Sequence, residues 1–112
     1  MTKKIFLLLF IVLISANSLF ALDTLRFKIT SVQQTAKRWR IGWEFEAQNP
    51  ANSEKIFTAL IEYLNDNGKT VYRDSVYGLR IDRREKKLFH GISIINSGLA
   101  EKITDISISL KK

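Results

Sequence analysis

The chain contains a single histidine, His90, and no cysteine. Histidine is the only side chain whose ordinary pKa lies near neutral pH, so His90 is the one residue that could serve unaided as a general base. No spacing motif links it to a serine or a carboxylate, and one histidine cannot form a two-histidine metal site. The lack of cysteine excludes disulfides, cysteine-bound zinc and iron–sulfur clusters. We therefore predict a chain without catalytic residues, metal or cofactor, with a small hydrolase that uses His90 beside a carboxylate as an alternative.

Carboxylate pairs are the next candidates for chemistry. Glu44 and Glu46 are two residues apart and could imitate the acids of a glycosidase. Such acids flank a cleft in separate environments, whereas neighbouring outward positions of one strand share a wet face. We expect both glutamates to pair with cations across a sheet. Asp66 and Asn67 precede Gly68 without the remaining ligands of a calcium loop, and turn chemistry explains them better.

Cationic side chains form two groups that could bind an anionic partner. One group lies at the start of a Trp-rich segment and the other surrounds a charged turn. The candidate surface consists of Arg38, Arg40, Arg80, Arg83, Arg84, Lys86 and Lys87. On one side of the molecule they would form a single anion-binding surface, and an exposed Tyr72 or Tyr77 could add stacking against a sugar ring. The alternative is a solvated loop whose cations keep strand edges from pairing with other chains.

The N-terminal segment has the three parts of a secretory signal peptide: two lysines, the apolar run Ile5 to Ile14, and then small residues. The run is shorter than the roughly 20 apolar residues of a transmembrane helix. We predict a signal-peptide helix over residues 1–21, cleaved after Ala21 or after Ser18, and a mature domain over residues 22–112. An uncleaved membrane anchor is the alternative.

The predicted export changes the interpretation of the charge. Removal of Lys3 and Lys4 with the leader lowers the net charge from +7 to +5. Outside the cytoplasm, a cationic surface meets anionic polysaccharide, lipid headgroups or an acidic protein face rather than nucleic acid. No cysteine follows the apolar run, so the protein is not expected to be a lipoprotein. We predict a secreted or periplasmic protein.

From Asp23 onward, the dominant period of apolar residues is two, which is typical of strands with one wet face. The clearest example is Arg38 to Glu46, in which every second residue is large and apolar. Turn signals recur about every ten residues, as in β-sandwiches. The fold predicted is an all-β, immunoglobulin-like β-sandwich of six to seven antiparallel strands. Strands are predicted over residues 25–30, 38–46, 56–64, 69–73, 75–81, 88–95 and 106–110.

The alternation also predicts the core. The inward residues are Leu25, Phe27, Ile29, Trp39, Ile41, Trp43, Phe45, Ile61, Ile92, Ile106 and Ile108. The strand over residues 88–95 is ambiguous, because either Leu88, Ile92 and Ile94 or the opposite set with Phe89 and Ile95 could face inward. We predict the first set.

A Trp-containing strand that ends at Asn49, a serine-containing loop and the stretch Ala59 to Lys69 follow one another along the chain. This order resembles the FxLYD-type domain, an immunoglobulin-like or fibronectin-III-like sandwich of exported bacterial proteins. The order of Tyr63 and Leu64 is reversed relative to that family, and its Pro-Gly before the later strand is replaced by Arg83 to Lys86. The resemblance implies the fold and carries no catalytic residues.

The sequence therefore favours a small, non-catalytic interaction module. It would recognise an envelope or secreted protein by edge-strand addition or through the basic loop. The alternative is a module that binds carbohydrate or an anionic envelope polymer, including lipid headgroups, through that loop.

Overall fold

The computed structural model describes residues 11–14 and 22–112, and this part of the chain is almost entirely β-structure. One short helix interrupts the strands near the C-terminus. In chain order the elements are β1 (Ile11–Ile14), β2 (Asp23–Gln34), β3 (Arg38–Gln48), β4 (Lys55–Leu64), β5 (Thr70–Ile81), β6 (Lys86–Asn96), α2 (Ser97–Ala100) and β7 (Asp105–Lys111).

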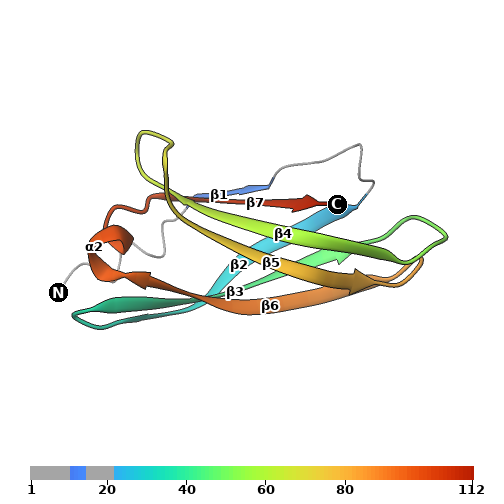
Figure 1. Cartoon of the computed structure of the whole chain (residues 1–112), viewed down its shortest axis with the longest axis horizontal. Coiled ribbons are helices and arrows are strands. Elements are labelled where there is room, and N and C mark those ends of the chain that lie inside the picture. The colour runs from blue at the N-terminus through green and yellow to red at the C-terminus, as the bar shows by residue number, and fades with distance from the viewer. Residues whose placement is uncertain (1–10, 15–21) are drawn as a thin grey trace.

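The strands form two sheets, which Figure 1 shows as stacked layers with β4 and β5 crossing in front of β2 and β3. The four-stranded sheet has the order β1-β7-β4-β5, and the three-stranded sheet has the order β2-β3-β6. All pairings are antiparallel except that of β1 with β7. This is the predicted all-β class, with two sheets arranged as in a β-sandwich.

One apolar core lies between the sheets, and the alternation predicted from the sequence accounts for much of it. In β3, Trp39, Ile41, Trp43 and Phe45 are buried, and Ile61, Ile106 and Ile108 meet them from β4 and β7. Phe27 is also buried and Ile29 packs against the core. These core predictions are confirmed.

The predicted parity of β6 is wrong. Leu88, Ile92 and Ile94 are 50%, 53% and 43% exposed, and His90 lies exposed among them, so Ile92 is not a core residue. The inward face of β6 carries Phe89, Gly91, Ser93 and Ile95 instead.

The bulk of Trp43 explains this inversion. Its register partner across β3 and β6 is Gly91, and a Cβ on that glycine would lie 2.5 Å from Trp43 Cζ2. Any side chain larger than hydrogen would therefore collide with the indole ring. The inner face of β6 therefore needs a glycine at this point, which places Phe89, Gly91, Ser93 and Ile95 inward and leaves Leu88, Ile92 and Ile94 on the outer face.

Ser93, the next inward residue, is the centre of a buried polar cluster. Its Oγ accepts hydrogen bonds from Trp43 Nε1 at 3.2 Å and from the Tyr63 hydroxyl at 2.7 Å, and donates to Asp74 Oδ2 at 2.7 Å. A serine hydroxyl has one donor and two acceptor sites, so all three are used. The four residues come from β3, β4, β5 and β6, so the cluster joins both sheets. Burial raises the pKa of the Tyr63 hydroxyl well above its ordinary value.

The two strands predicted over residues 69–73 and 75–81 are one continuous strand, β5. Gly78 has a φ of +68° where the register of β4 with β5 shifts, so it allows a bulge within the strand instead of ending it. Gly68, with a φ of +76°, closes the predicted turn before β5. The strand predicted over residues 56–64 is central in its sheet, as expected.

The predicted signal-peptide helix lies outside the described residues except at Ile11–Ile14, which form β1 rather than a helix. These four residues run parallel to Asp105–Ile108 of β7. β-Branched isoleucine and valine favour such an extended conformation. Within the described ranges, no helix has the length and hydropathy needed to span a lipid bilayer.

Candidate functional site

The two predicted basic groups lie at opposite ends of the three-stranded sheet. Arg38 is in register with Asn96 at one end of the β3–β6 pair, and Gln48 is in register with Lys86 at the other. Ten residue steps along a strand separate these ends by about 33 Å. The seven cations therefore do not form one anion-binding surface.

Several cations in and beside the charged turn at residues 82–85 make contacts within the protein. Arg84 donates from its backbone N–H to the Ala51 carbonyl and from Nε to Asn52 Oδ1 at 2.8 Å. Arg80 forms an ion pair with Glu54 at 3.6 Å, while the Lys87 ammonium lies 5.5 Å from the centre of the Phe89 ring. Cations that hold neighbouring loops in place are less available to a ligand.

The buried side chain of Asn49 fixes this turn. Asn49 is fully buried, and its Nδ2 donates to the carbonyls of Ser53, Ile81 and Asp82. Its Oδ1 accepts from the Ala51 backbone N–H at 3.0 Å. In the sequence, Asn49 stands before proline, which is typical of any loop, and ends the Trp-containing strand of the FxLYD-type resemblance; neither signal predicts these contacts.

The predicted role of the glutamates on β3 is confirmed. Glu44 Oε2 lies 3.2 Å from Lys28 Nζ, and Glu46 Oε1 lies 3.7 Å from Arg26 Nε, both across the β2–β3 pair. His90 is exposed at the register position next to Glu44 on the outer face of β6. Among residues 11–14 and 22–112, no group of histidine and carboxylate side chains could hold a metal ion.

The outer face of β6 carries an apolar stripe, which consists of Leu88, Ile92 and Ile94. Three of the six exposed large apolar residues of the described chain thus lie on one face of one strand. Gly42 of β3 is in register with Ile92, and it adds no side chain of its own to the centre of this surface. Among the described strands, β6 pairs with β3 alone, so it is an edge strand of its sheet.

The opposite face of the molecule carries a shallow groove of about 500 Å³ on the outer side of the four-stranded sheet. The groove crosses β5, β4 and the end of β7, and it combines hydroxyl, charged and aromatic side chains. By strand register, its residues stand in three rows: Tyr77, Thr58 and Lys111; then Ser75 and Leu60; then Arg73 and Glu62.

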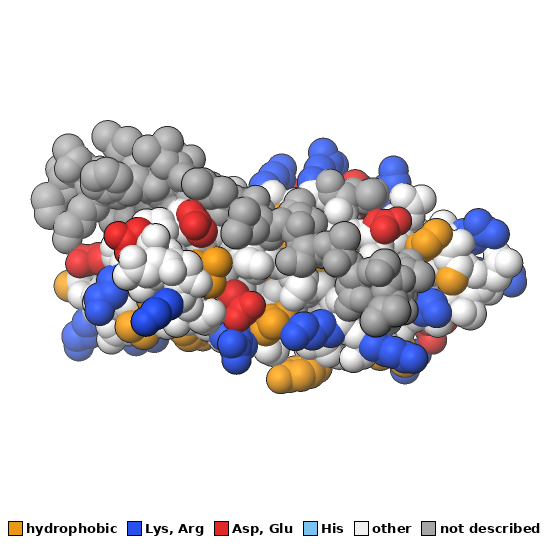
Figure 2. All heavy atoms as spheres, turned by 90° about the horizontal axis from the view of Figure 1, so that it is seen from above, with side chains coloured by type: hydrophobic (Ala, Val, Ile, Leu, Met, Phe, Trp, Pro, Cys, Tyr) orange, Lys and Arg blue, Asp and Glu red, His pale blue; other side chains and the backbone are white. Residues whose placement is uncertain are grey.

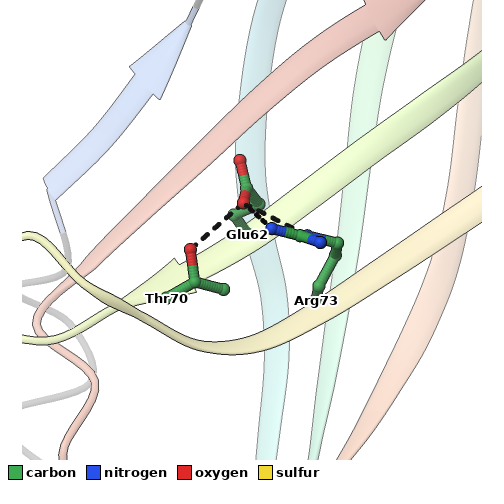
Figure 3. Close-up of polar contacts among 3 residues, drawn as sticks. All are labelled: Glu62, Thr70 and Arg73. Atoms are coloured by element: carbon green, nitrogen blue, oxygen red, sulfur yellow. Dashed lines mark hydrogen bonds and ion pairs between the residues drawn. The ribbon is translucent and has the colours of Figure 1, made fainter.

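Glu62 is held in a fixed position in this groove (Figure 3). Its Oε2 accepts from Thr70 Oγ1 at 3.1 Å and from Arg73 Nε and Nη2 at 3.2 and 3.0 Å. Figure 3 shows the other carboxylate oxygen pointing away from both partners. One oxygen of Glu62 is therefore used for positioning, and the other can accept a hydrogen bond from a ligand.

The two candidate tyrosines have different surroundings. Tyr77 is 76% exposed and lines the groove. Tyr72 is half-buried, with its ring centre 6.0 Å from that of Tyr63. Only Tyr77 can stack against a ligand.

Charge is dispersed over the rest of the surface. In the face shown in Figure 2, lysine and arginine side chains are scattered along the whole length, with acidic and apolar side chains among them. On this face the described cations do not form one continuous basic patch.

No family model matches the chain, and no curated protein matches its sequence. Among solved structures, the chain is similar to part of a β-glucuronidase from glycoside hydrolase family 2, with a TM-score of 0.57 and 16% identity. The match covers 75% of this chain and 11% of the enzyme, so the chain spans a small part of that protein's length. The likeness shows a shared β-sandwich fold.

Proposed function

We propose that this chain is a non-catalytic interaction module of the immunoglobulin-like type, exported to the periplasm or the exterior, which binds a protein partner at β6. The observation that carries the proposal is the apolar stripe on the outer face of that strand. The resemblance to FxLYD-type domains agrees with such a role and remains a prediction.

Two features of β6 favour a protein partner. An edge strand presents backbone N–H and C=O groups to which an extended segment of another chain can add. Side chains on an added strand would lie beside the stripe, where Ile92 at its centre is 53% exposed. Affinity from buried apolar area does not rest on ion pairs, so moderate salt should not weaken it by screening.

The test is capture of partners from a host envelope extract at low and at moderate salt, with Ile92→Ser as the main variant. Ile56→Ser is the matched control, because Ile56 is 51% exposed but lies on the other sheet. We expect the unmodified protein and Ile56→Ser to retain one discrete protein at moderate salt, and Ile92→Ser to lose it.

The same experiment tests the charged turn as the alternative binding surface. The double variant Arg83→Glu with Lys86→Glu reverses two exposed cations and leaves the stripe unchanged. Loss of the partner with this variant, together with retention by Ile92→Ser, would move the binding surface from β6 to the turn.

A further inference from the structure

We propose that the groove on the four-stranded sheet is a second binding site, for an acidic oligosaccharide of the envelope. It lies on the opposite sheet from the apolar stripe, so it is independent of the proposed protein site. Three features of the groove favour this ligand: an aromatic platform, a positioned carboxylate and an excess of cations.

Tyr77 provides the platform. It lies beside the bulge at Gly78 and is 76% exposed, although an aromatic ring of this size is ordinarily buried at least in part. The flat ring can pack against the apolar face of a pyranose. Thr58 is the neighbouring outward residue on β4, and its hydroxyl can bond the polar edge of the same ring.

Glu62 and Arg73 favour a polyhydroxylated ligand such as a sugar. The carboxylate of Glu62 can accept hydrogen bonds from sugar hydroxyls. Its two partners hold Oε2, so the direction of the remaining oxygen is set before a ligand arrives. The Arg73 side chain is 60% exposed, and its guanidinium keeps further N–H groups for a ligand carboxylate.

The charges of the groove favour an acidic rather than a neutral sugar. Arg73, Lys111 and Lys112 contribute three positive charges, and Glu62 contributes one negative charge. The rows of Tyr77 and Arg73 are four residue steps apart along β4, or about 13 Å. A ligand that reaches both rows is therefore an oligomer, and the groove volume lies within the usual range of roughly 300–1,000 Å³ for ligand sites.

The test is a calorimetric titration of the purified protein with an oligogalacturonate and with its methyl ester, which keeps the rings and removes the charges. We expect the acid form to bind and the ester to bind at least tenfold more weakly. Tyr77→Ala should weaken binding of the acid about tenfold, while Tyr77→Phe, the matched control, should stay within about twofold. Because Tyr77 is exposed, both variants should keep the unfolding midpoint of the unmodified protein.

Three results would overturn the proposal: no binding of the acid form, equal binding of the ester, or equal binding by Tyr77→Ala. Binding lost in Arg83→Glu with Lys86→Glu, and kept in the groove variants, would assign the sugar to the charged turn instead. The Ile92→Ser variant should bind the oligomer normally, which separates this proposal from the proposed protein site.

Discussion

Two polar clusters in this molecule use the same kinds of side chain in opposite surroundings. The first is the buried hub of Ser93 with Trp43, Tyr63 and Asp74, and the second is the exposed set of Glu62 with Thr70 and Arg73. In each, a hydroxyl or carboxylate oxygen accepts several hydrogen bonds at 2.7–3.2 Å.

Burial gives the two clusters different roles. In the hub, Trp43, Tyr63 and Ser93 are buried, so water does not readily replace a lost partner of these three residues, whereas Asp74 is half-buried. Around Glu62, water or a ligand can take over any contact. Polar chemistry between the sheets therefore determines stability, while similar chemistry on the outer face remains available for binding.

The largest expected effect comes from Ser93→Ala. This change leaves the Trp43 N–H and the Tyr63 hydroxyl without their buried acceptor, at a cost of about 3 kcal/mol in the free energy of unfolding. Urea denaturation followed by tryptophan fluorescence measures it. Ser109→Ala, on the outer face of β7, is the control and should change stability by less than about 0.5 kcal/mol. Equal stability of the two variants would show that the hydrogen bonds of the hub do not stabilise the fold.

Gly91→Ala tests the packing beside the hub. The added Cβ would approach Trp43 Cζ2 to 2.5 Å, so the indole must move away from Ser93, at a cost of about 2 kcal/mol. Gly98→Ala is the control, since its nearest contact is the flexible Asn96 side chain at 3.2 Å. Both are compared by thermal unfolding, and Gly91→Ala should also shift the tryptophan emission. An unchanged emission would mean that the Trp43 indole leaves room for a side chain at position 91, so its bulk would not explain which residues of β6 face inward.

Alkaline pH tests the hub without mutation. Burial raises the pKa of Tyr63 above its ordinary value of 10.0, so below that pH the hydroxyl is neutral in both folded and unfolded chains. Above pH 10.0 the unfolded chain loses the proton while the folded chain keeps it. The free energy of unfolding should therefore fall by up to about 1.4 kcal/mol per pH unit from this residue.

Urea titrations from about pH 9 to about pH 11.5 measure this dependence. Tyr63→Phe has no ionisable group at the position and is the comparison. The same slope in both proteins would assign the alkaline loss of stability to other groups.

The smallest effect is expected at the exposed cluster. Glu62→Ala, Arg73→Ala and the double variant should show a coupling energy of less than about 1 kcal/mol, as is usual for solvent-exposed ion pairs. The unfolding free energies of the three variants and the unmodified protein give this coupling. A value near that of the hub would mean that the groove is part of the structural framework and not an accessible site.

The sequence predicted the strands well where one face is apolar and the other polar. In β3, the large apolar residues Trp39, Ile41, Trp43 and Phe45 alternate with charged residues and one glycine, so only one face of the strand can point inward. In β6, both faces carry aliphatic residues, and the choice depends on the size of Trp43, a residue about fifty positions away in the chain. Local patterns contain no such information, so the parity was predicted wrongly and the exposed stripe was missed.

The candidate sites show the same limit. Cations can be counted in a sequence, but their separation by the length of the β3–β6 pair depends on strand register. The sequence indicated Tyr77 as a possible stacking residue, while the groove residues Thr58, Glu62 and Lys111 come from two other strands. The contacts of Asn49 could not be predicted, because its three carbonyl acceptors lie in two separate loops and a strand end.

The hub also has a consequence for how fast the chain folds. Its three hydrogen bonds join residues that are 50, 30 and 19 positions apart, so no local segment can form it. Contacts of such separation form only after long loops have closed, and folds that depend on them reach the native state in milliseconds to seconds. During that interval the Trp43 indole and the Ser93 hydroxyl are both hydrated. Burial of Trp43 should therefore be a late event in refolding, and its fluorescence, observed in a Trp39→Phe variant, would report the docking of the two sheets rather than the formation of either one.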